Sequence, residues 1–219
     1  MELLAAGRDA DVFALDGDRV LRRYRDGRPA APDADLLSAV VASGFPAPAV
    51  LGVEGADLVL ERLDGPSLGS AVFDGGHDAA AGGVLLADLH SRLHALPWEG
   101  GTLLHLDLHP FNVVLARRGP VVIDWTDARP GPAGLDVAMT ALVCAQAALS
   151  PDTTPLRDLP AEAVFRATST MLASFVAAAG SDYLDHLDEA LALRRANPMM
   201  TGDELARLDE AVALASRPA

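Results

Sequence analysis

The sequence predicts an α+β protein, with a small antiparallel β-rich part first and a mainly helical part after it. The first sixty or so residues alternate short apolar runs with turn residues around one helical segment. Asp64-Gly65-Pro66 then interrupts this pattern, and most of the remaining chain has helical periodicity. Strands grouped before helices are typical of the α+β class. We therefore expect one part over residues 1–63 and a second over residues 64–219.

The N-terminal part is punctuated by clear turn and helix signals. Asp16-Gly17-Asp18 is a strong hairpin turn, Pro32-Asp33 is a typical helix start, and Gly44 ends that helix. The expected elements are strands over 2–6, 11–15 and 19–24, a helix over 33–43, and strands over 50–53 and 58–61.

The C-terminal part contains one β-like interruption among helices. Apolar runs at 113–115 and 121–123 flank Arg117-Arg118-Gly119-Pro120, which predicts a hairpin. The expected helices cover 82–94, 135–149, 161–179, 183–197 and 202–215.

The most informative segment is His105-Leu-Asp107-Leu-His109-Pro-Phe-Asn112, followed beyond the hairpin by Ile123-Asp124-Trp125. A hairpin of this length brings the loop before it and the loop after it to the same end. We therefore expect Asp107, Asn112 and Asp124 to converge. Phosphoryl transfer needs one carboxylate to position a hydroxyl and take its proton, and oxygen ligands for Mg²⁺. The spacing predicts that chemistry.

The motif has the form H-x-D-x-H-x-x-N followed by I-D-W, in place of the H-R-D and D-F-G of protein kinases. In this form it resembles the aminoglycoside phosphotransferase family of small-molecule kinases. The resemblance runs from Leu3 to about Ala148 and is most specific over 105–138. It implies a two-lobed protein-kinase-like fold, with 1–63 as the nucleotide-binding lobe and 64–219 as the catalytic and acceptor-binding lobe.

The resemblance assigns roles to residues of the motif. Asp107 takes the place of the catalytic base, and Asn112 and Asp124 take those of the two magnesium ligands. His105 is expected to brace the loop through its imidazole. Asp136 resembles a structural aspartate that caps a helix and ties down the catalytic loop, and an ordinary helix N-cap predicts an Asp there as well.

The chain contains no lysine, and all 17 basic residues are arginine. Arg22 falls where the family carries a lysine on its third strand, so it is expected to pair with the α- and β-phosphates. Its expected carboxylate partner is Asp33, with Asp35 as the alternative, while Arg23 points to the other face of the strand. The resemblance also places the adenine at the backbone carbonyl of Glu61 and the backbone amide of Leu63.

Composition excludes several classes of function. The formal net charge of −14 makes nucleic acid a poor partner, because that binding depends on Lys and Arg. No run approaches the roughly twenty apolar residues of a membrane span, and no signal peptide is visible, so a cytoplasmic location is expected. The only cysteine, Cys144, excludes an internal disulfide and is expected in the core. We expect a monomer or a homodimer.

The leading hypothesis is an O-phosphotransferase that uses ATP (or GTP) and Mg²⁺. Its acceptor is expected to be a small hydroxylated molecule: an aminoglycoside or another antibiotic, or a metabolite such as choline or an amino sugar. The alternative is a nucleotide-binding pseudokinase, favoured by the missing lysine, by a phosphate loop with one glycine, and by Leu106, where many family members have glycine. His90 and His94 have the spacing of metal ligands, but their apolar helix face favours packed core histidines.

Overall fold

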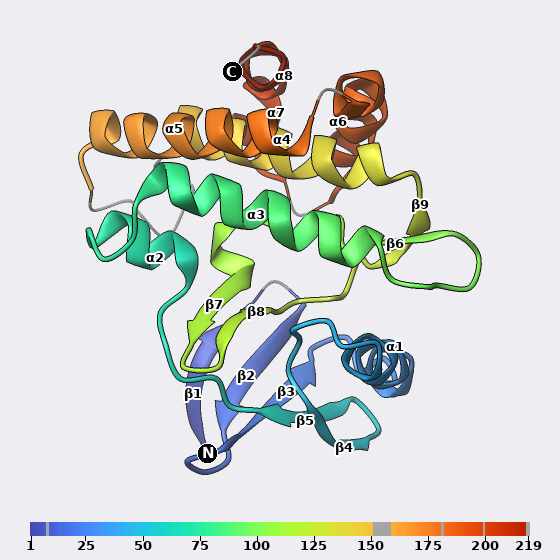
Figure 1. Cartoon of the computed structure of the whole chain (residues 1–219). Coiled ribbons are helices and arrows are strands. Elements are labelled where there is room, and N and C mark those ends of the chain that lie inside the picture. The colour runs from blue at the N-terminus through green and yellow to red at the C-terminus, as the bar shows by residue number, and fades with distance from the viewer. Residues whose placement is uncertain (8, 151–158, 181, 199, 218–219) are drawn as a thin grey trace. The chain divides into compact units, whose positions relative to one another are not determined.

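The computed structural model describes the whole chain except residues 8, 151–158, 181, 199 and 218–219 (Figure 1). The chain forms two compact units, Met1–Pro66 with Val114–Thr126, and Ser67–Val113 with Asp127–Ala219. The predicted α+β class is confirmed. The N-terminal unit also includes residues 114–126, whereas the sequence predicts a single boundary after residue 63. The assignment of nucleotide binding and catalysis to residues 1–63 and 64–219 stays a prediction.

A five-stranded antiparallel sheet forms the N-terminal unit. Its strands are β1 (Glu2–Ala6), β2 (Ala10–Ala14), β3 (Arg19–Tyr24), β4 (Val50–Glu54) and β5 (Asp57–Glu61), in the order β1-β2-β3-β5-β4. Arg22 lies opposite Val12 on one side and Leu58 on the other. Helix α1 (Ala31–Ala42) contributes Ala34 to the core that Tyr24 and Leu58 share.

The predicted hairpin is present as β7 (Val113–Ala116) and β8 (Gly119–Val122), with a shorter turn than the sequence suggests. It joins the N-terminal unit through hydrogen bonds from Leu115 N to Pro66 O at 2.9 Å and from Val122 N to Pro46 O at 2.8 Å. A side chain at Gly65 would place its Cβ 2.2 Å from the Leu115 carbonyl oxygen, and the φ of Gly65 is +146°. Only glycine allows this close approach.

The C-terminal unit is a set of helices with one short pair of strands. Its elements are α2 (Leu68–Phe73), α3 (Ala79–His94), β6 (Thr102–Leu104), β9 (Arg129–Gly131), α4 (Ala133–Leu149), α5 (Ala161–Ala179), α6 (Leu187–Ala196), α7 (Gly202–Ala206) and α8 (Leu208–Ala215). Helices α3, α4 and α5 pack side by side, and most of α4 is buried (Figure 1). A Cβ on Gly83 would lie 2.2 Å from the backbone oxygen of Met171 on α5, so α3 and α5 cross where a side chain is missing.

Some element boundaries differ from those expected. The helix predicted over 183–197 begins as a 3₁₀ turn, Asp182–His186, before α6. The helix predicted over 202–215 is divided at Arg207 into α7 and α8. The three-residue strands β6 and β9 are too short to leave a periodic signal. No single helix among the described residues is long and apolar enough to cross a membrane.

Candidate active site

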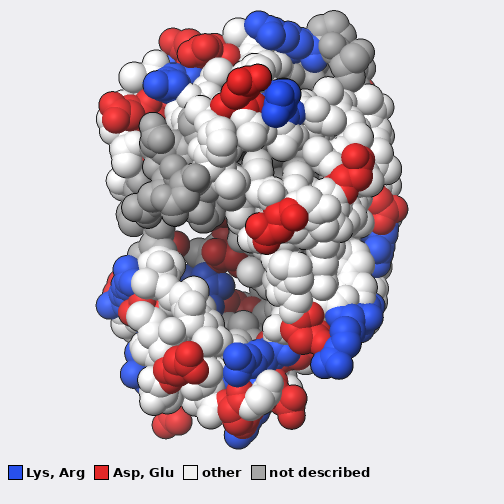
Figure 2. Space-filling model, turned by 90° about the vertical axis from the view of Figure 1, so that its left-hand side faces the viewer, with Lys and Arg blue, Asp and Glu red and all other residues white. Residues whose placement is uncertain are grey.

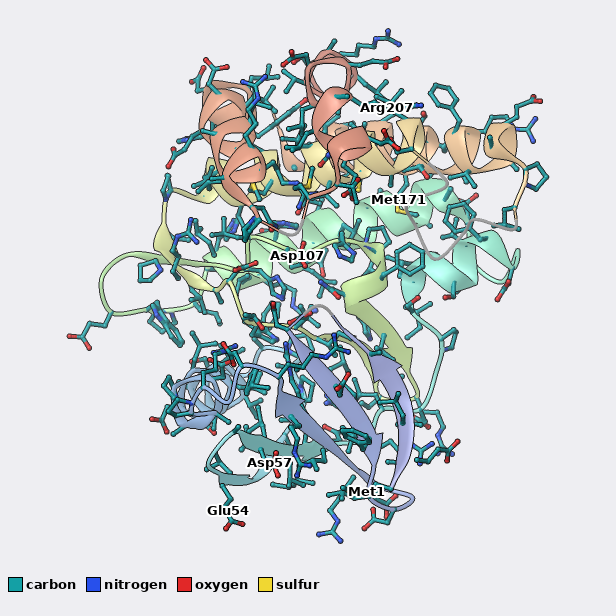
Figure 3. All side chains as sticks on the ribbon, turned by 180° about the vertical axis from the view of Figure 1, so that it is seen from behind. Met1, Glu54, Asp57, Asp107, Met171 and Arg207 are labelled. Atoms are coloured by element: carbon teal, nitrogen blue, oxygen red, sulfur yellow. The ribbon has the colours of Figure 1, made fainter. Side chains whose placement is uncertain are left out.

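The segment 105–112 leads from β6 into β7 and carries Asp107, which is labelled in Figure 3. Asn112 closes a short 3₁₀ turn, and its amide nitrogen donates to the backbone oxygen of Asp107 at 2.8 Å and to Oδ2 of the carboxylate at 3.0 Å. Because the amide nitrogen faces Asp107, the amide oxygen of Asn112 points the other way. It is a hard oxygen ligand of the kind that Mg²⁺ prefers. The structure thus brings two of the predicted site residues together.

Asp136 supports this loop from the first turn of α4. Its Oδ2 accepts the backbone N–H of His105 at 3.0 Å, and its Oδ1 accepts that of Leu106 at 2.6 Å. Nε2 of His94 lies 2.9 Å from Oδ2. These bonds hold Leu106 at a φ of +63°, a left-handed conformation that costs an L-residue roughly 1–2 kcal/mol. A leucine therefore occupies a position where the resemblance leads us to expect glycine.

The carboxylate of Asp136 is fully buried and remains ionised. Burial acts to raise its pKa, but the hydrogen bond from His94 and the backbone N–H of His105 outweigh burial and lower the pKa to about 2. A buried carboxylate with three donors is stable in the charged form. The anchor of the 105–112 loop is therefore a permanent negative charge near neutral pH.

His90 extends the support of the loop to Leu108, through Thr140. Its Nδ1 lies 2.8 Å from the Leu86 carbonyl oxygen and its Nε2 lies 3.1 Å from the Thr140 hydroxyl, which donates to the Leu108 carbonyl at 3.0 Å. Burial lowers the pKa of His90. Of the two histidines on α3, one therefore contacts the loop anchor and the other contacts the loop through Thr140. His90 is a buried core residue, as predicted, whereas the side chain of His94 is 13% exposed.

The N-terminal unit holds the second pair of predicted site residues. Arg22 donates from Nη2 to Oδ1 of Asp124 at 2.7 Å and to the Thr126 hydroxyl at 2.8 Å. The side chain of Arg22 is 14% exposed and that of Asp124 is 45% exposed. Asp124 itself has a φ of +63°. Arg22 of β3 and Asp124, which follows β8, are thus direct partners.

The ion pair expected between Arg22 and Asp33 is wrong. Asp33, in the first turn of α1, pairs with Arg28 at 3.1 and 3.3 Å and accepts a hydrogen bond from the hydroxyl of Tyr24. The guanidinium of Arg28 stacks over the Tyr24 ring at 3.9 Å, while that of Arg22 lies 5.2 Å from the ring centre. The side chain of Asp33 is one methylene shorter than that of glutamate, and its carboxylate binds the neighbouring Arg28 and Tyr24 in place of Arg22. Asp33 therefore braces the region around Arg22 through Tyr24.

The predicted hinge residues lie at the end of β5 and just beyond it. The side chain of Glu61 is bound by Arg118 at 2.8 and 3.0 Å and by the backbone N–H of Ala49 at 3.2 Å. Leu63 is half-buried in irregular backbone. The Glu61 side chain therefore stabilises the fold. The contacts predicted with adenine involve only backbone groups.

The strand register provides a test of the Arg22 assignment. Arg23 faces away from Arg22 and forms a bidentate pair with Asp57 at 2.5 and 2.6 Å. We expect Arg22→Ala to weaken MgATP binding roughly 10-fold or more, since a hydrogen bond to a charged group contributes roughly 1.5–3 kcal/mol. Arg22→Lys should retain most binding, and Arg23→Ala should bind like the wild type in the same calorimetric titration. Damage from Arg23→Ala with a silent Arg22→Ala would contradict the assignment.

Several residues of the site carry no sequence signal. Thr126 lies in a turn, Tyr24 in a strand and Thr140 in a helix, and nothing in the sequence marks them. The fold places them beside Arg22, Asp33 and Leu108 respectively. His109 belongs to the motif, but the sequence suggests no role for it. Its Nε2 lies 3.6 Å from Oδ2 of Asp107.

Part of the chain, which includes the 105–112 loop, matches a known protein family. Residues 99–174 match the model of the phosphotransferase enzyme family, APH. No curated protein sequence matches the chain.

Three solved structures share the fold over nearly the whole chain. A choline/ethanolamine kinase family protein from Mesorhizobium loti has a TM-score of 0.58 and 15% identity, covering 99% of this chain and 88% of that one. The gentamicin complex of APH(2")-IIa has a TM-score of 0.57 and 11% identity, covering 96% and 90%. Amicoumacin kinase with AMP-PNP, Ca²⁺ and amicoumacin has a TM-score of 0.52 and 12% identity, covering 98% and 87%. The predicted resemblance is therefore confirmed: residues 99–174 match the phosphotransferase enzyme family, and the chain has the protein-kinase-like fold of these small-molecule kinases.

Proposed function

We propose that this protein is an ATP-dependent O-phosphotransferase that moves the γ-phosphate to a hydroxyl of a small molecule. The observation that carries the proposal is the bracing of Asp107. Its loop is anchored by a buried, ionised Asp136, and the Asn112 amide lies directly against it. A rigid, supported carboxylate next to an oxygen ligand for a divalent cation is what phosphoryl transfer requires.

In this mechanism Asp107 orients the acceptor hydroxyl and takes its proton. The acceptor oxygen forms a bond to the γ-phosphorus while the bond from that phosphorus to the β–γ bridging oxygen breaks, and ADP leaves with the electron pair. Arg22 pairs with the α- and β-phosphates. The backbone carbonyl of Glu61 and the backbone amide of Leu63 bind the adenine, and GTP is the alternative nucleotide.

The chemistry of two donor groups suits a magnesium ion that the nucleotide would largely bind. Asn112 would supply an amide oxygen, and Asp124 would supply an exposed carboxylate. Within the described residues, no group of three His, Cys, Asp or Glu side chains is placed to hold a metal. Such a small protein contribution is usual for Mg²⁺, which keeps waters and phosphate oxygens as its other ligands. The ion would neutralise charge on the phosphates.

The proteins that share the fold suggest which acceptors to test first. They include a choline/ethanolamine kinase family protein and APH(2")-IIa in complex with gentamicin, so amino alcohols and aminoglycosides are the first acceptors to test. Net charge supports a cationic acceptor only weakly. Figure 2 shows acidic and basic side chains interspersed over the face that it presents.

The second candidate is a nucleotide-binding pseudokinase, and the pairing of Arg22 with Asp124 favours it. In that pair the proposed phosphate ligand neutralises the proposed magnesium ligand. Release of ADP with an acceptor panel separates the two functions. Turnover with any amino alcohol or aminoglycoside supports the kinase, whereas nucleotide binding without turnover supports the pseudokinase.

Removal of the proposed magnesium ligands tests the metal site. We expect Asp124→Ala to abolish magnesium-dependent nucleotide binding and Asn112→Ala to weaken it less, because a carboxylate outweighs a neutral amide for a hard cation. Calorimetric titration of ATP with and without Mg²⁺ measures both effects. Undiminished magnesium-dependent binding in the Asp124 variant would rule out its role as a ligand.

A further inference from the structure

His109, two residues beyond Asp107, has an imidazole whose two nitrogens face different partners. Nδ1 accepts the backbone N–H of Phe111 at 3.2 Å, which caps the 3₁₀ turn Pro110–Asn112. Nε2 lies 3.6 Å from Oδ2 of Asp107, slightly beyond hydrogen-bonding distance. The side chain is 22% exposed. The capping bond engages Nδ1, and Nε2 lies close to the carboxylate of Asp107.

The capping bond also determines which nitrogen carries the proton. A nitrogen that accepts an N–H bond cannot itself be protonated, and a neutral imidazole carries one N–H. The ring of His109 is therefore the Nε2–H tautomer, and its donor faces the carboxylate of Asp107. A shift of a few tenths of an ångström would complete an N–H···O bond of ordinary length.

Two donors thus approach the same oxygen of Asp107. Asn112 Nδ2 lies 3.0 Å from Oδ2, and the Nε2–H of His109 faces that oxygen as well. We infer that His109 is a positioning residue: together with Asn112 it holds Oδ2 of Asp107 in place, which fixes the direction in which the other carboxylate oxygen points. The inference rests on the proposed function, in which that carboxylate meets the acceptor hydroxyl.

The backbone of the loop is held without the imidazole of His109. His109 N donates to Asp107 O at 2.9 Å, Asn112 N donates to His109 O at 2.9 Å, and Asp136 anchors the preceding residues. Substitutions at His109 should therefore leave the fold intact and separate its capping role from its positioning role.

The decisive pair of variants is His109→Asn and His109→Gln. Asparagine places its amide oxygen near the position of Nδ1 and is a favoured capping residue, but it has no group near the position of Nε2. Glutamine is one methylene longer and can carry an amide donor toward Asp107. We expect His109→Asn to lower kcat roughly 10- to 100-fold, because a displacement of about 1 Å in a reacting group can cost about 100-fold. Its melting temperature and its dissociation constant for MgATP should match those of the wild type, and His109→Gln should recover part of kcat.

Three kinetic outcomes would overturn the inference. The first is an unchanged kcat in His109→Asn, and the second is a His109→Gln variant no faster than His109→Asn. The third is a loss of kcat accompanied by a lower melting temperature and weaker MgATP binding, which would mean that His109 acts only as the cap of the 3₁₀ turn.

A measurement without turnover keeps the inference distinct from the proposed function. In ¹⁵N NMR of histidine-labelled protein, the imidazole signals that disappear in His109→Asn should be those of a neutral Nε2–H tautomer and should shift in Asp107→Asn. An Nδ1–H tautomer, or no response to Asp107→Asn, would contradict the geometry. If the wild type phosphorylates no acceptor, the proposed function fails, and the NMR experiment still decides whether His109 contacts Asp107.

Discussion

Asp107→Asn is expected to abolish phosphoryl transfer while nucleotide binding stays close to that of the wild type. The substitution preserves the size of the side chain but removes the charge that accepts the hydroxyl proton, and general-base catalysis typically contributes about 10²–10⁴-fold. In the mechanism Asp107 faces the acceptor, so the affinity for MgATP should change little. The measurement pairs ADP release with an active acceptor and calorimetric titration of MgATP.

A matched control is available on the surface of the same unit. Asp88 on α3 is 57% exposed and pairs with Arg92 across one helical turn, so Asp88→Asn makes the same chemical change away from the loop. It should behave as the wild type in both assays. Turnover of Asp107→Asn within about threefold of the wild type would remove Asp107 from the role of base.

Asp136→Asn is expected to destabilise the protein in a pH-dependent way. An asparagine has one acceptor oxygen where the carboxylate serves His105 N, Leu106 N and His94, so at least one buried donor loses its partner at a cost of roughly 1–3 kcal/mol. The loop that carries Asp107 should loosen at the same time, and kcat should fall with stability.

The sign of the pH effect follows from the lowered pKa. Asp136 titrates at about 2 in the folded protein, against an ordinary value of 3.8. Its ionised form therefore contributes roughly 2 kcal/mol of stability above about pH 4, and this contribution is lost as the pH falls toward 2. Urea unfolding at pH 7, 5, 4 and 3 should show the difference between wild type and Asp136→Asn shrinking below pH 4. A difference that stays constant with pH would contradict a buried, ionised anchor, and Asp88→Asn again serves as the control.

Local patterns in the sequence were sufficient for much of the fold. Turn residues and apolar periodicity predicted the β-rich start, the hairpin and most helices, with boundaries displaced by one to three residues in several elements. The alternation of side chains along a strand predicted that Arg22 and Arg23 lie on opposite faces, and they do have separate partners, Asp124 and Asp57. These features depend on neighbours in the chain, which is why a sequence alone can specify them.

Side-chain partners were decided by the tertiary structure. The sequence paired Arg22 with an acid on the helix because of resemblance, but Arg28 and Tyr24 lie closer to Asp33, and Arg22 reaches Asp124, 102 residues further along the chain. The contact from Thr140 to Leu108 and the approach of His109 to Asp107 are likewise matters of a few ångströms. The motif by itself predicts which residues perform the chemistry. Which hydrogen bonds hold them depends on distances between segments far apart in sequence, and only the packed helices and sheet set those distances.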